Sequence, residues 1–354
     1  MKAGVNPDTV ILARELRGLT QFELAEGLGI SQAKVSKLED GLSRVTDIEL
    51  AALTRVVRLP ISFFFRHDVP KSSFTWFYRK RASVPQKLLV QFNARVCWRL
   101  AQIERLRRKT EMDIRTLSFC DPEEYSEGPA EIAAQVRQVL GVPPGPIKNL
   151  IDVLEDAGIF IVEEDFGSTK LDGVNAFTQG GAPVIFLNSA LPRSRRVFTA
   201  VHELGHLIMH RLPRPSAENE TNEFTAEFLL PKDQIQPDFH SCGKISLDTL
   251  ARLKLKWRVS IGALLKRALM LGFIDQKRFV YLRVQIAQEG YRLDEPHEAL
   301  FGLHGPSLEK ELIEIHLREL GYTREDLCEL LDFFDPAEFD EQYADEHPFL
   351  QVVR

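Results

Sequence analysis

The chain has 354 residues, 44% of them hydrophobic and 27% charged, the ordinary balance of a soluble protein with two or three domains. No apolar run approaches the about 18 residues of a membrane-spanning helix, and no apolar signal segment opens the chain, so we expect a cytoplasmic protein without a membrane partner. The four cysteines are scattered without metal-binding spacing, which predicts reduced thiols and argues against a thiolate metal site.

The net charge of −6 averages over two blocks of opposite sign. Residues 71–120 carry twelve Lys and Arg against three acidic residues, whereas residues 286–354 carry eighteen Asp and Glu against five Lys and Arg. Contact with a polyanion depends on local surface charge rather than on the overall balance. The acidic total therefore does not argue against nucleic-acid binding.

Residues 1–68 predict a compact unit of five short helices. Thr20 and Glu23 have the spacing of a capping box at the start of the second helix, and Gly29 ends that helix. Ser31 caps the third. Two short helices joined by a tight glycine turn make a helix-turn-helix. The other expected helices cover residues 8–17, 47–56 and 60–65.

The helix-turn-helix pattern is carried by Thr20-Gln21, Leu24-Ala25, Gly29, Val35-Ser36 and Glu39-Asp40-Gly41. It resembles the Cro/cI-like (XRE) family of DNA-binding regulators. The resemblance implies that the residues near phosphates or base edges are Gln21, Gln32, Ala33, Lys34, Ser36, Lys37 and Arg44. It also implies operator DNA as a double-stranded partner and a homodimer that reads two half-sites. Because this block carries nine basic and nine acidic residues, a helical protein-interaction module remains the alternative.

Residues 69–128 predict a basic helical linker. From Pro85 to about Leu117, apolar residues step by four and then by three, as on one face of a helix. The cations at Arg95, Arg99 and Arg105 lie off that apolar row. One interpretation is a connecting or dimerising helix with a solvated basic face. The other is that this face lies along the DNA backbone.

Residues 129–285 predict a domain of helices around a small sheet. Helices are expected at 130–140 and 147–156, followed by strands at 158–162, 174–177 and 184–187. The Gln179-Gly180-Gly181 segment between the last two strands predicts a hairpin. A strand at the edge of the sheet is expected to pair with an extended peptide substrate, but the pattern does not say which strand that is.

After these strands comes the segment His202-Glu203-Leu204-Gly205-His206. It lies in a predicted helix from Arg196 to His210, where two histidines four residues apart point the same way. Two neutral imidazoles can hold one Zn²⁺, while the carboxylate between them reaches a water molecule rather than the metal. Glu203 is therefore the expected general base. Gly205 leaves room for a close backbone or substrate.

A second helix, from Glu218 to Pro231, follows two prolines and begins with acidic residues. The quoted histidine motif and the segment Glu220-Thr221-Asn222-Glu223-Phe224-Thr225-Ala226-Glu227 resemble the ImmA/IrrE family of zinc metallopeptidases. The resemblance implies Glu220 as the third zinc ligand beside His202 and His206. Glu223, one turn further on, is the alternative. His210 is interpreted as structural or as a support for the ligands.

Residues 286–354 predict an acidic helical region, with helices at 307–320 and 325–333. Acidic helices are most often simply solvated. The alternatives are a docking surface or an intramolecular cover over the basic linker.

Together these patterns predict an α+β fold dominated by helices. It consists of a helix-turn-helix domain (1–68), a basic linker (69–128), a zincin-like peptidase domain with about three strands (129–285) and an acidic C-terminal region (286–354). The resemblances imply a transcriptional regulator that cleaves a repressor-type protein, itself or a partner, in response to a signal. The alternative is a non-proteolytic repressor whose zincin-like domain senses a ligand or partner.

Overall fold

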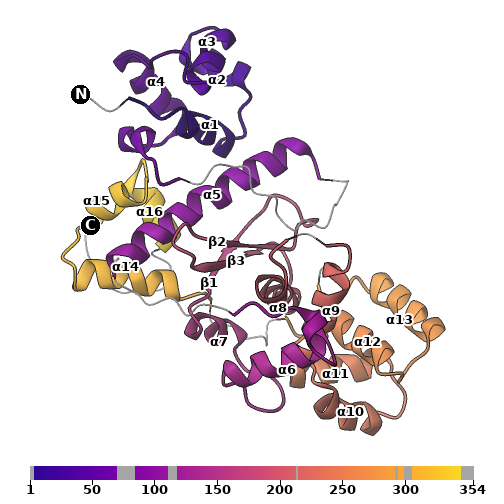
Figure 1. The fold of residues 1–354 in the computed structure, drawn as a ribbon. Helices are drawn as coiled ribbons and strands as arrows, with labels where there is room; N and C mark the ends of the chain where they lie inside the picture. The colour runs from indigo at the N-terminus through magenta and orange to yellow at the C-terminus, as the bar shows by residue number, and fades with distance from the viewer. Residues whose placement is uncertain are drawn as a thin grey trace.

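The computed structural model describes residues 4–69, 84–110, 118–212, 214–291, 294–298 and 305–343. Helices dominate, and they surround one three-stranded sheet (Figure 1), which confirms the expected α+β class. None of the described helices is both long and apolar enough to cross a membrane. The predicted end of the basic helix, residues 111–117, lies outside the described residues.

The N-terminal head contains four α-helices and one 3-10 helix: α1 (Pro7–Leu16), α2 (Gln21–Leu28), α3 (Gln32–Glu39), α4 (Asp47–Val57) and η1 (Ile61–Phe65). Thr20 and Glu23 form the predicted capping box, and Gly29 ends α2 with a φ of 66°. The fifth predicted helix is the 3-10 turn. Its Phe63 and Phe64 are fully buried and pack in the core of the head.

Helix α5 (Gln86–Lys109) runs between the head and the sheet (Figure 1). Its Ala94 and Cys97 belong to the core of the head, whereas Phe92, Leu100 and Ile103 belong to a second core under the sheet. A helix that contributes to two cores holds the head on the rest of the protein. The segment predicted as a linker is therefore, over residues 86–109, a central structural helix.

Two cations of α5 are neither solvated nor exposed to DNA, which were the two expectations for the basic face of this helix. Arg99 and Arg105 are only 4% and 6% exposed. Arg99 pairs with Glu309 at 2.6 Å, and Arg105 pairs with Asp68 at 2.6 Å and with Asp332. Neither side chain is solvated or available to a DNA backbone, so both interpretations are wrong for these two residues. Burial and ion pairing with distant acidic residues could not be read from the periodicity of the helix.

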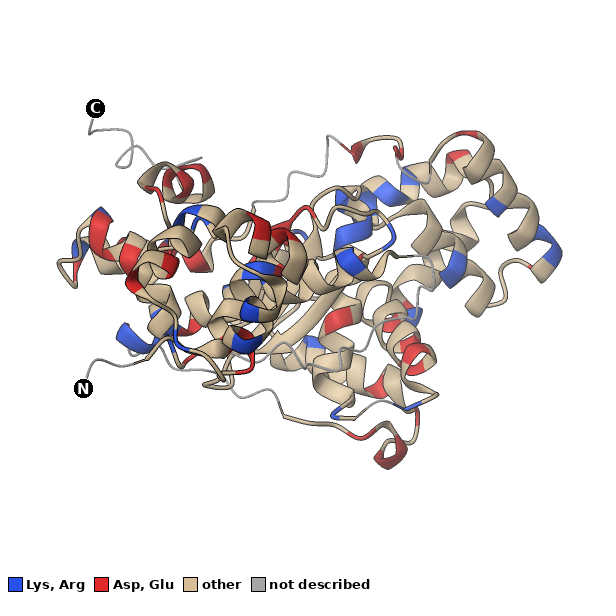
Figure 2. Cartoon of the chain, turned by 90° about the horizontal axis from the view of Figure 1, so that it is seen from above, with Lys and Arg blue, Asp and Glu red and all other residues tan. Residues whose placement is uncertain are grey.

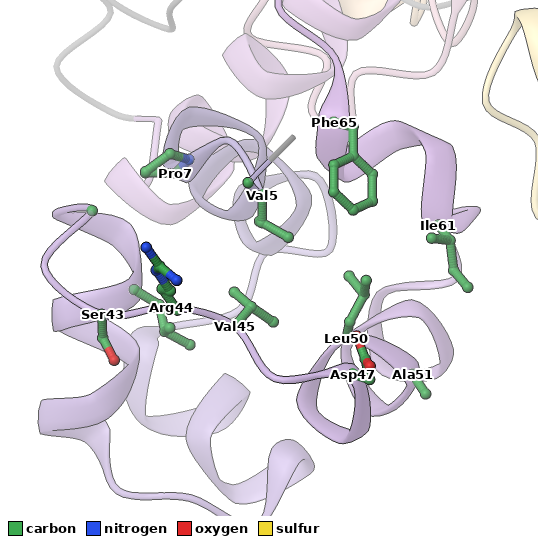
Figure 3. A pocket seen from close by; sticks show the side chains of 13 residues that line it. Val5, Pro7, Ser43, Arg44, Val45, Asp47, Leu50, Ala51, Ile61 and Phe65 are labelled. Carbon is green, nitrogen blue, oxygen red and sulfur yellow. The ribbon is translucent and has the colours of Figure 1, made fainter. Parts of the chain in front are cut away.

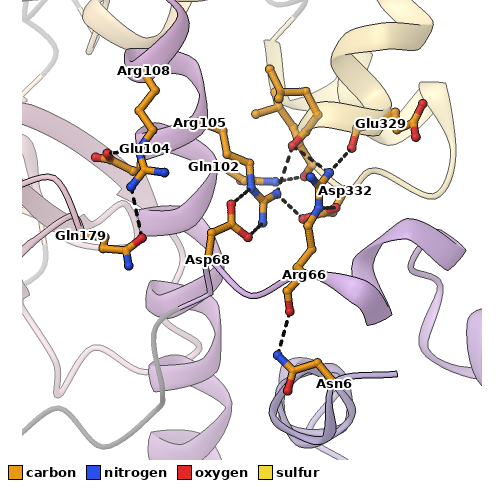
Figure 4. Close-up of polar contacts among 12 residues, drawn as sticks. Asn6, Arg66, Asp68, Gln102, Glu104, Arg105, Arg108, Gln179, Glu329 and Asp332 are labelled. Carbon is orange, nitrogen blue, oxygen red and sulfur yellow. Dashed lines mark hydrogen bonds and ion pairs between the residues drawn. The ribbon is translucent and has the colours of Figure 1, made fainter. Parts of the chain in front are cut away.

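The acidic C-terminal region forms α14 (Leu308–Arg318), α15 (Arg324–Leu330) and α16 (Pro336–Tyr343). These helices pack in the same core as α5, and α14 also contacts β1. Figure 2 shows acidic and basic segments side by side where the N- and C-terminal regions meet, and Figure 4 shows how Arg66, Asp68, Arg105 and Asp332 interlock there. The finding agrees with the intramolecular alternative, in which acidic residues cover cations of α5.

The sheet contains β1 (Phe160–Glu164), β2 (Gly173–Phe177) and β3 (Pro183–Asn188) in the order β1-β3-β2. β1 and β3 are parallel, and β2 pairs with β3 antiparallel through the predicted hairpin, with Val174 opposite Phe186. Since β3 is central, β2 is an edge strand within the described part of the chain.

The remaining helices gather on one side of the sheet (Figure 1): η2 (Pro122–Glu124), α6 (Pro129–Val139), α7 (Leu150–Asp156), α8 (Arg193–Met209), α9 (Ala217–Leu229), α10 (Lys232–Ser241), α11 (Leu247–Trp257), α12 (Ile261–Met270) and α13 (Gln276–Gln288). α8 packs on β2 and β3, and α9 packs on α8. The largest core lies here, because Val201, Leu204 and Ile208 of α8 turn inwards towards Phe224 and Phe228 of α9.

Candidate metal centre and nucleic-acid interface

Helix α8 presents His202 and His206 on one face, one turn apart, with their ring centres separated by 4.9 Å. The opposite face of the helix is apolar and buried, which fixes how the helix rotates on the sheet. His206 is 2% exposed and His202 is half-buried. The pair is thus held in place by the core while one side of it reaches solvent.

A carboxylate from α9 faces this pair, and it belongs to Glu218. Its two oxygens lie 3.8 Å from Nε2 of His202 and 3.7 Å from Nε2 of His206. The sequence analysis did not select Glu218. The only signal for it was its place in the acidic first turn of the second helix.

The three side chains fit a zinc ion. One ligand atom from each of His202, His206 and Glu218 lies within 4.8 Å of the other two. A tetrahedral ion with bonds of about 2.0–2.2 Å holds its neighbouring ligand atoms about 3.3–3.6 Å apart, so small side-chain rotations would bring the three ligand atoms to that spacing. Two imidazoles and one carboxylate are also the donor set of a catalytic zinc site, which keeps a fourth position open.

The family resemblance implied that Glu220 lies beside the imidazole pair, but the structure places its carboxylate elsewhere. Its Oε2 atom lies 2.8 Å from Nε2 of His210 and accepts a hydrogen bond from Arg214 at 2.9 Å. Residues two apart on a helix point in nearly opposite directions, because each residue turns the helix by about 100°. Glu223, the alternative third ligand, is exposed.

Burial alone would raise the pKa of Glu220, but hydrogen bonds from His210, Ser216 and Arg214 outweigh it and lower the pKa below its usual value. Burial lowers the pKa of His210, against the opposing effect of Glu220. The first shift favours the ionised carboxylate of Glu220, and the second favours the neutral imidazole of His210.

Two glycines allow the elements of the site to approach closely. A Cβ atom on Gly205 of α8 would lie 3.0 Å from side-chain atoms of Phe224 and Thr221 on α9. A Cβ atom on Gly173 of β2 would lie 2.5 Å from Thr199 on α8. The room predicted at Gly205 is thus taken by the neighbouring helix, and both contacts fix the positions of the ligands.

Glu203 is buried between α8 and β2, where Asn175 donates a hydrogen bond of 2.6 Å to its Oε2 atom. Burial raises the pKa of Glu203, while His206 and the hydrogen bond from Asn175 act in the opposite direction. A carboxylate with a raised pKa is a better proton acceptor. Asn175 could not be selected from the sequence, because its role depends on how β2 packs against α8.

The predicted DNA-facing residues lie on and around α3. Gln32, Ala33, Lys37 and Arg44 are exposed, and Ser36 is half-buried. These positions share the solvent side of the head, opposite the buried residues Val35 and Leu38. Such an arrangement can meet the major groove of a duplex.

Two other predicted contacts have partners inside the protein. Gln21 donates a hydrogen bond of 2.9 Å to Glu39, which also binds Arg14 at 2.6 Å. Lys34 donates to the Ser43 hydroxyl at 2.8 Å and lies 3.7 Å from Glu49. These two side chains therefore hold α3 against its neighbours in this structure.

A groove of about 1120 Å³ opens beside the end of α3. Figure 3 shows Arg44 on one side of it and the apolar residues Leu50 and Ile61 on the other. The groove therefore joins the basic residue expected near a phosphate to an apolar surface of the head.

Comparison with known proteins assigns both parts of the molecule. Residues 154–269 match the IrrE N-terminal-like domain of a peptidase family, and residues 10–64 match the helix-turn-helix domain. The chain thus combines a helix-turn-helix domain with an IrrE N-terminal-like domain. The first includes α3, and the second includes α8, α9 and the whole sheet.

Two curated relatives match a stretch of this chain. They are uncharacterized HTH-type transcriptional regulators from Sinorhizobium medicae and Rhizobium meliloti, each 37% identical over 59 residues. That match covers 17% of this chain and 42% of each relative, so the chain spans less than half of their length.

Proposed function

We propose that this protein is a DNA-binding transcriptional regulator whose IrrE-like domain is a zinc-dependent peptidase acting on a repressor-type protein. The observation that carries the proposal is the position of Glu203, a buried carboxylate beside three convergent ligand side chains. A purely structural zinc site has no need of a base at that position.

In this proposal His202, His206 and Glu218 hold the zinc ion, and Glu218 takes the role that the resemblance assigned to Glu220. Zinc in that position supplies positive charge that polarises a peptide carbonyl and lowers the pKa of a water molecule. The donor distances, the burial of His206 and the peptidase-family match of this domain support the assignment.

The residues of the chain supply the proton transfers. Asn175 holds Oε2 of Glu203, which leaves the Oε1 atom to accept a proton from the attacking water. The same carboxyl group then returns the proton to the leaving amine. Burial raises the pKa of Glu203 against the opposing effects of His206 and the Asn175 hydrogen bond, and a raised pKa makes the carboxylate a better proton acceptor.

The edge strand β2 provides a place for an extended substrate. It carries Asn175 and packs on α8, so a peptide added along it runs past Glu203. Main-chain hydrogen bonds to an edge strand bind a peptide without demanding one sequence. A flexible segment of a repressor, of this chain itself or of a partner, is the expected substrate.

The regulatory part of the proposal joins this centre to the head. A cytoplasmic homodimer would bind two half-sites of operator DNA through Gln32, Lys37 and Arg44. A signal such as DNA damage or mobile-element induction would then lead to cleavage and release of repression. The direct packing of α1 on α5, and of α5 against the sheet, supports a mechanical link between the two domains.

The test of the catalytic step is Glu203→Gln. The zinc-loaded protein is incubated with operator DNA and with repressors encoded beside its gene, and mass spectrometry follows fragments of every chain. Wild type should cleave one of them, and the variant should lose at least about 100-fold in rate with its zinc content unchanged.

Glu223→Gln is the matched control, because it removes an exposed carboxylate from the neighbouring helix and should leave cleavage unchanged. Cleavage at the wild-type rate in Glu203→Gln, with zinc still bound, would refute the proposed catalytic role. Zinc binding without any fragment in the wild type would favour a sensor domain instead.

The DNA-binding step is tested by combining Gln32→Ala with Lys37→Ala. Operator sequences selected from genomic DNA should bind this variant more weakly by about 1–3 kcal/mol for each lost base contact. Wild-type binding should also weaken steeply with salt. Lys277→Ala, in the exposed first turn of α13, is the control and should bind normally. Equal binding by the double variant would exclude α3 as the reading helix.

A further inference from the structure

His206, the second histidine of the candidate metal centre, is itself in hydrogen-bonding contact with a further histidine, His210. Nδ1 of His206 lies 3.0 Å from Nδ1 of His210, and both side chains are buried. A hydrogen bond between two ring nitrogens needs one N–H and one lone pair. One ring must therefore donate from its Nδ1 atom and the other must accept at its Nδ1 atom, and the distance alone does not say which ring donates.

Glu220, at the far end of this row of hydrogen bonds, determines which ring donates. Its Oε2 atom lies 2.8 Å from Nε2 of His210, and an ionised carboxylate can only accept. Arg214 donates to the same oxygen at 2.9 Å, so a guanidinium already balances the carboxylate charge. Nε2 of His210 consequently carries the proton, and its Nδ1 keeps a lone pair.

Thr221 adds a constraint on the space between the two rings. Its hydroxyl donates to the Ala217 carbonyl at 2.7 Å, so towards the two imidazoles its oxygen can only accept. That oxygen lies 3.3 Å from Nδ1 of His206 and 3.4 Å from Nδ1 of His210. An N–H must point into this space. Since His210 has a lone pair there, the N–H belongs to His206.

We propose that Glu220 and His210 are positioning residues that fix the tautomer of His206. With its proton on Nδ1, His206 directs the lone pair of Nε2 to the side of Glu218, where the zinc ligands converge. The opposite tautomer would place an N–H there and block coordination. Outer hydrogen bonds of this kind orient ligand histidines in metal sites generally.

This inference rests on the proposed zinc site for its purpose but not for its main test. None of these hydrogen bonds includes the zinc ion as a partner, so the tautomer of His206 can be measured in the metal-free protein. The inference also gives Glu220 a role different from that of Glu218, which lies two residues away. The sequence pattern alone does not distinguish the roles of these two carboxylates.

The first experiment is nitrogen NMR of the metal-free full-length protein labelled with ¹⁵N-histidine, with His206→Gln and His210→Gln variants for assignment. We expect the proton of His206 on Nδ1 and that of His210 on Nε2. A proton on Nε2 of His206 in the wild type would overturn the proposal, whether or not the protein binds zinc.

The second experiment compares Glu220→Ala with Glu220→Gln in competition for Zn²⁺ with a chromophoric chelator. Removing the acceptor in Glu220→Ala should weaken zinc binding by about 10–100-fold. The Gln variant should remain within about threefold of wild type. Its amide oxygen can still accept from His210 and Arg214, which both present N–H groups to that position.

Glu223→Ala is the matched control on the same helix and should leave both measurements unchanged. Equal losses in Glu220→Gln and Glu220→Ala, together with full affinity in Glu218→Ala, would make Glu220 a direct ligand and overturn the proposal. Absence of zinc binding in the wild type would instead refute the proposed function, while the NMR result would still judge the tautomer.

Discussion

Among the regions of this protein that bury charged side chains, two arrange them differently. Around α5, the Arg105 cluster (Arg66, Asp68, Arg105 and Asp332) sets two guanidinium groups against two carboxylates (Figure 4). At the crossing of α8 and α9, His202, His206 and Glu218 each bring one possible ligand atom within 4.8 Å of the other two. Charges that are paired within the protein hold its parts together. Ligand atoms that converge in this way can instead bind a metal cation.

The same comparison explains why composition was a poor guide to function. The twelve cations of residues 71–120 were the most conspicuous charge feature, yet Arg99 and Arg105 bind acidic residues more than 200 positions away or in the segment after η1. The metal centre, by contrast, adds little to the net charge. A functional site is recognised by the direction of its donor atoms rather than by their number.

The largest expected effect comes from breaking the Arg105 cluster. Arg105→Met should cost about 3–5 kcal/mol of unfolding free energy, because Asp332 is fully buried and would lose its closest cation. Urea denaturation of the full-length protein measures this. The loss should include the contact between the head and the C-terminal helices, since Arg66 and Asp68 belong to the same cluster.

Arg58→Ala is the control for that experiment. Arg58 also joins the head to the C-terminal region, through Glu338 at 2.6 Å, but its side chain is 53% exposed. An exposed pair contributes only about 0.2–1 kcal/mol. Equal losses in the two variants would show that burial is not what makes the Arg105 cluster strong.

Metal removal gives the next largest effect and tests the other region. If zinc is present at about 100 times its dissociation constant, chelation should lower the unfolding free energy by about 2.7 kcal/mol, because zinc binds the folded state alone. Glu218→Ala should remove nearly all of this difference, whereas Arg105→Met should retain it. Thermal denaturation with and without chelator measures both.

A chelator effect that survives intact in Glu218→Ala would place the third ligand elsewhere. A chelator effect that disappears in Arg105→Met would mean that the Arg105 cluster and the metal centre are energetically coupled, and not independent of each other.

The sequence predicted those features that depend on local spacing. The four-residue interval from His202 to His206 needs only the helical period, and the capping box of Thr20 and Glu23 needs only one turn. The hairpin from β2 to β3 follows from its glycines. Each of these features is determined by residues within a few positions of one another.

Features that depend on packing between elements were not predictable in this way. Glu218, rather than Glu220, lies beside the imidazole pair because of how α9 rotates against α8, where Gly205 lets Phe224 and Thr221 approach. Asn175 reaches Glu203 only because β2 lies on α8. The burial of Arg99 requires Glu309, far along the chain. Periodicity within one element carries no record of these contacts.

The smallest expected effect from a buried group concerns Glu104, another buried charge that is matched within the protein. Its carboxylate accepts hydrogen bonds from Thr178 at 2.6 Å, Arg108 at 2.7 Å and Arg107 at 2.9 Å. Burial would raise its pKa, but these partners outweigh it and lower the pKa below the usual 4.5. At neutral pH, Glu104→Gln should cost about 1.5 kcal/mol, the lower range for a charged hydrogen bond.

The pH dependence of that cost follows from the direction of the shift. A carboxyl group with a lowered pKa in the folded state stabilises the protein above its unfolded pKa and loses this contribution as the pH falls through the folded value. The difference in unfolding free energy between wild type and Glu104→Gln should therefore be constant near neutrality and shrink below about pH 4.5. Urea denaturation at several pH values measures it. A difference that stays the same in acid would show that the shape of the side chain, and not its charge, joins α5 to the hairpin.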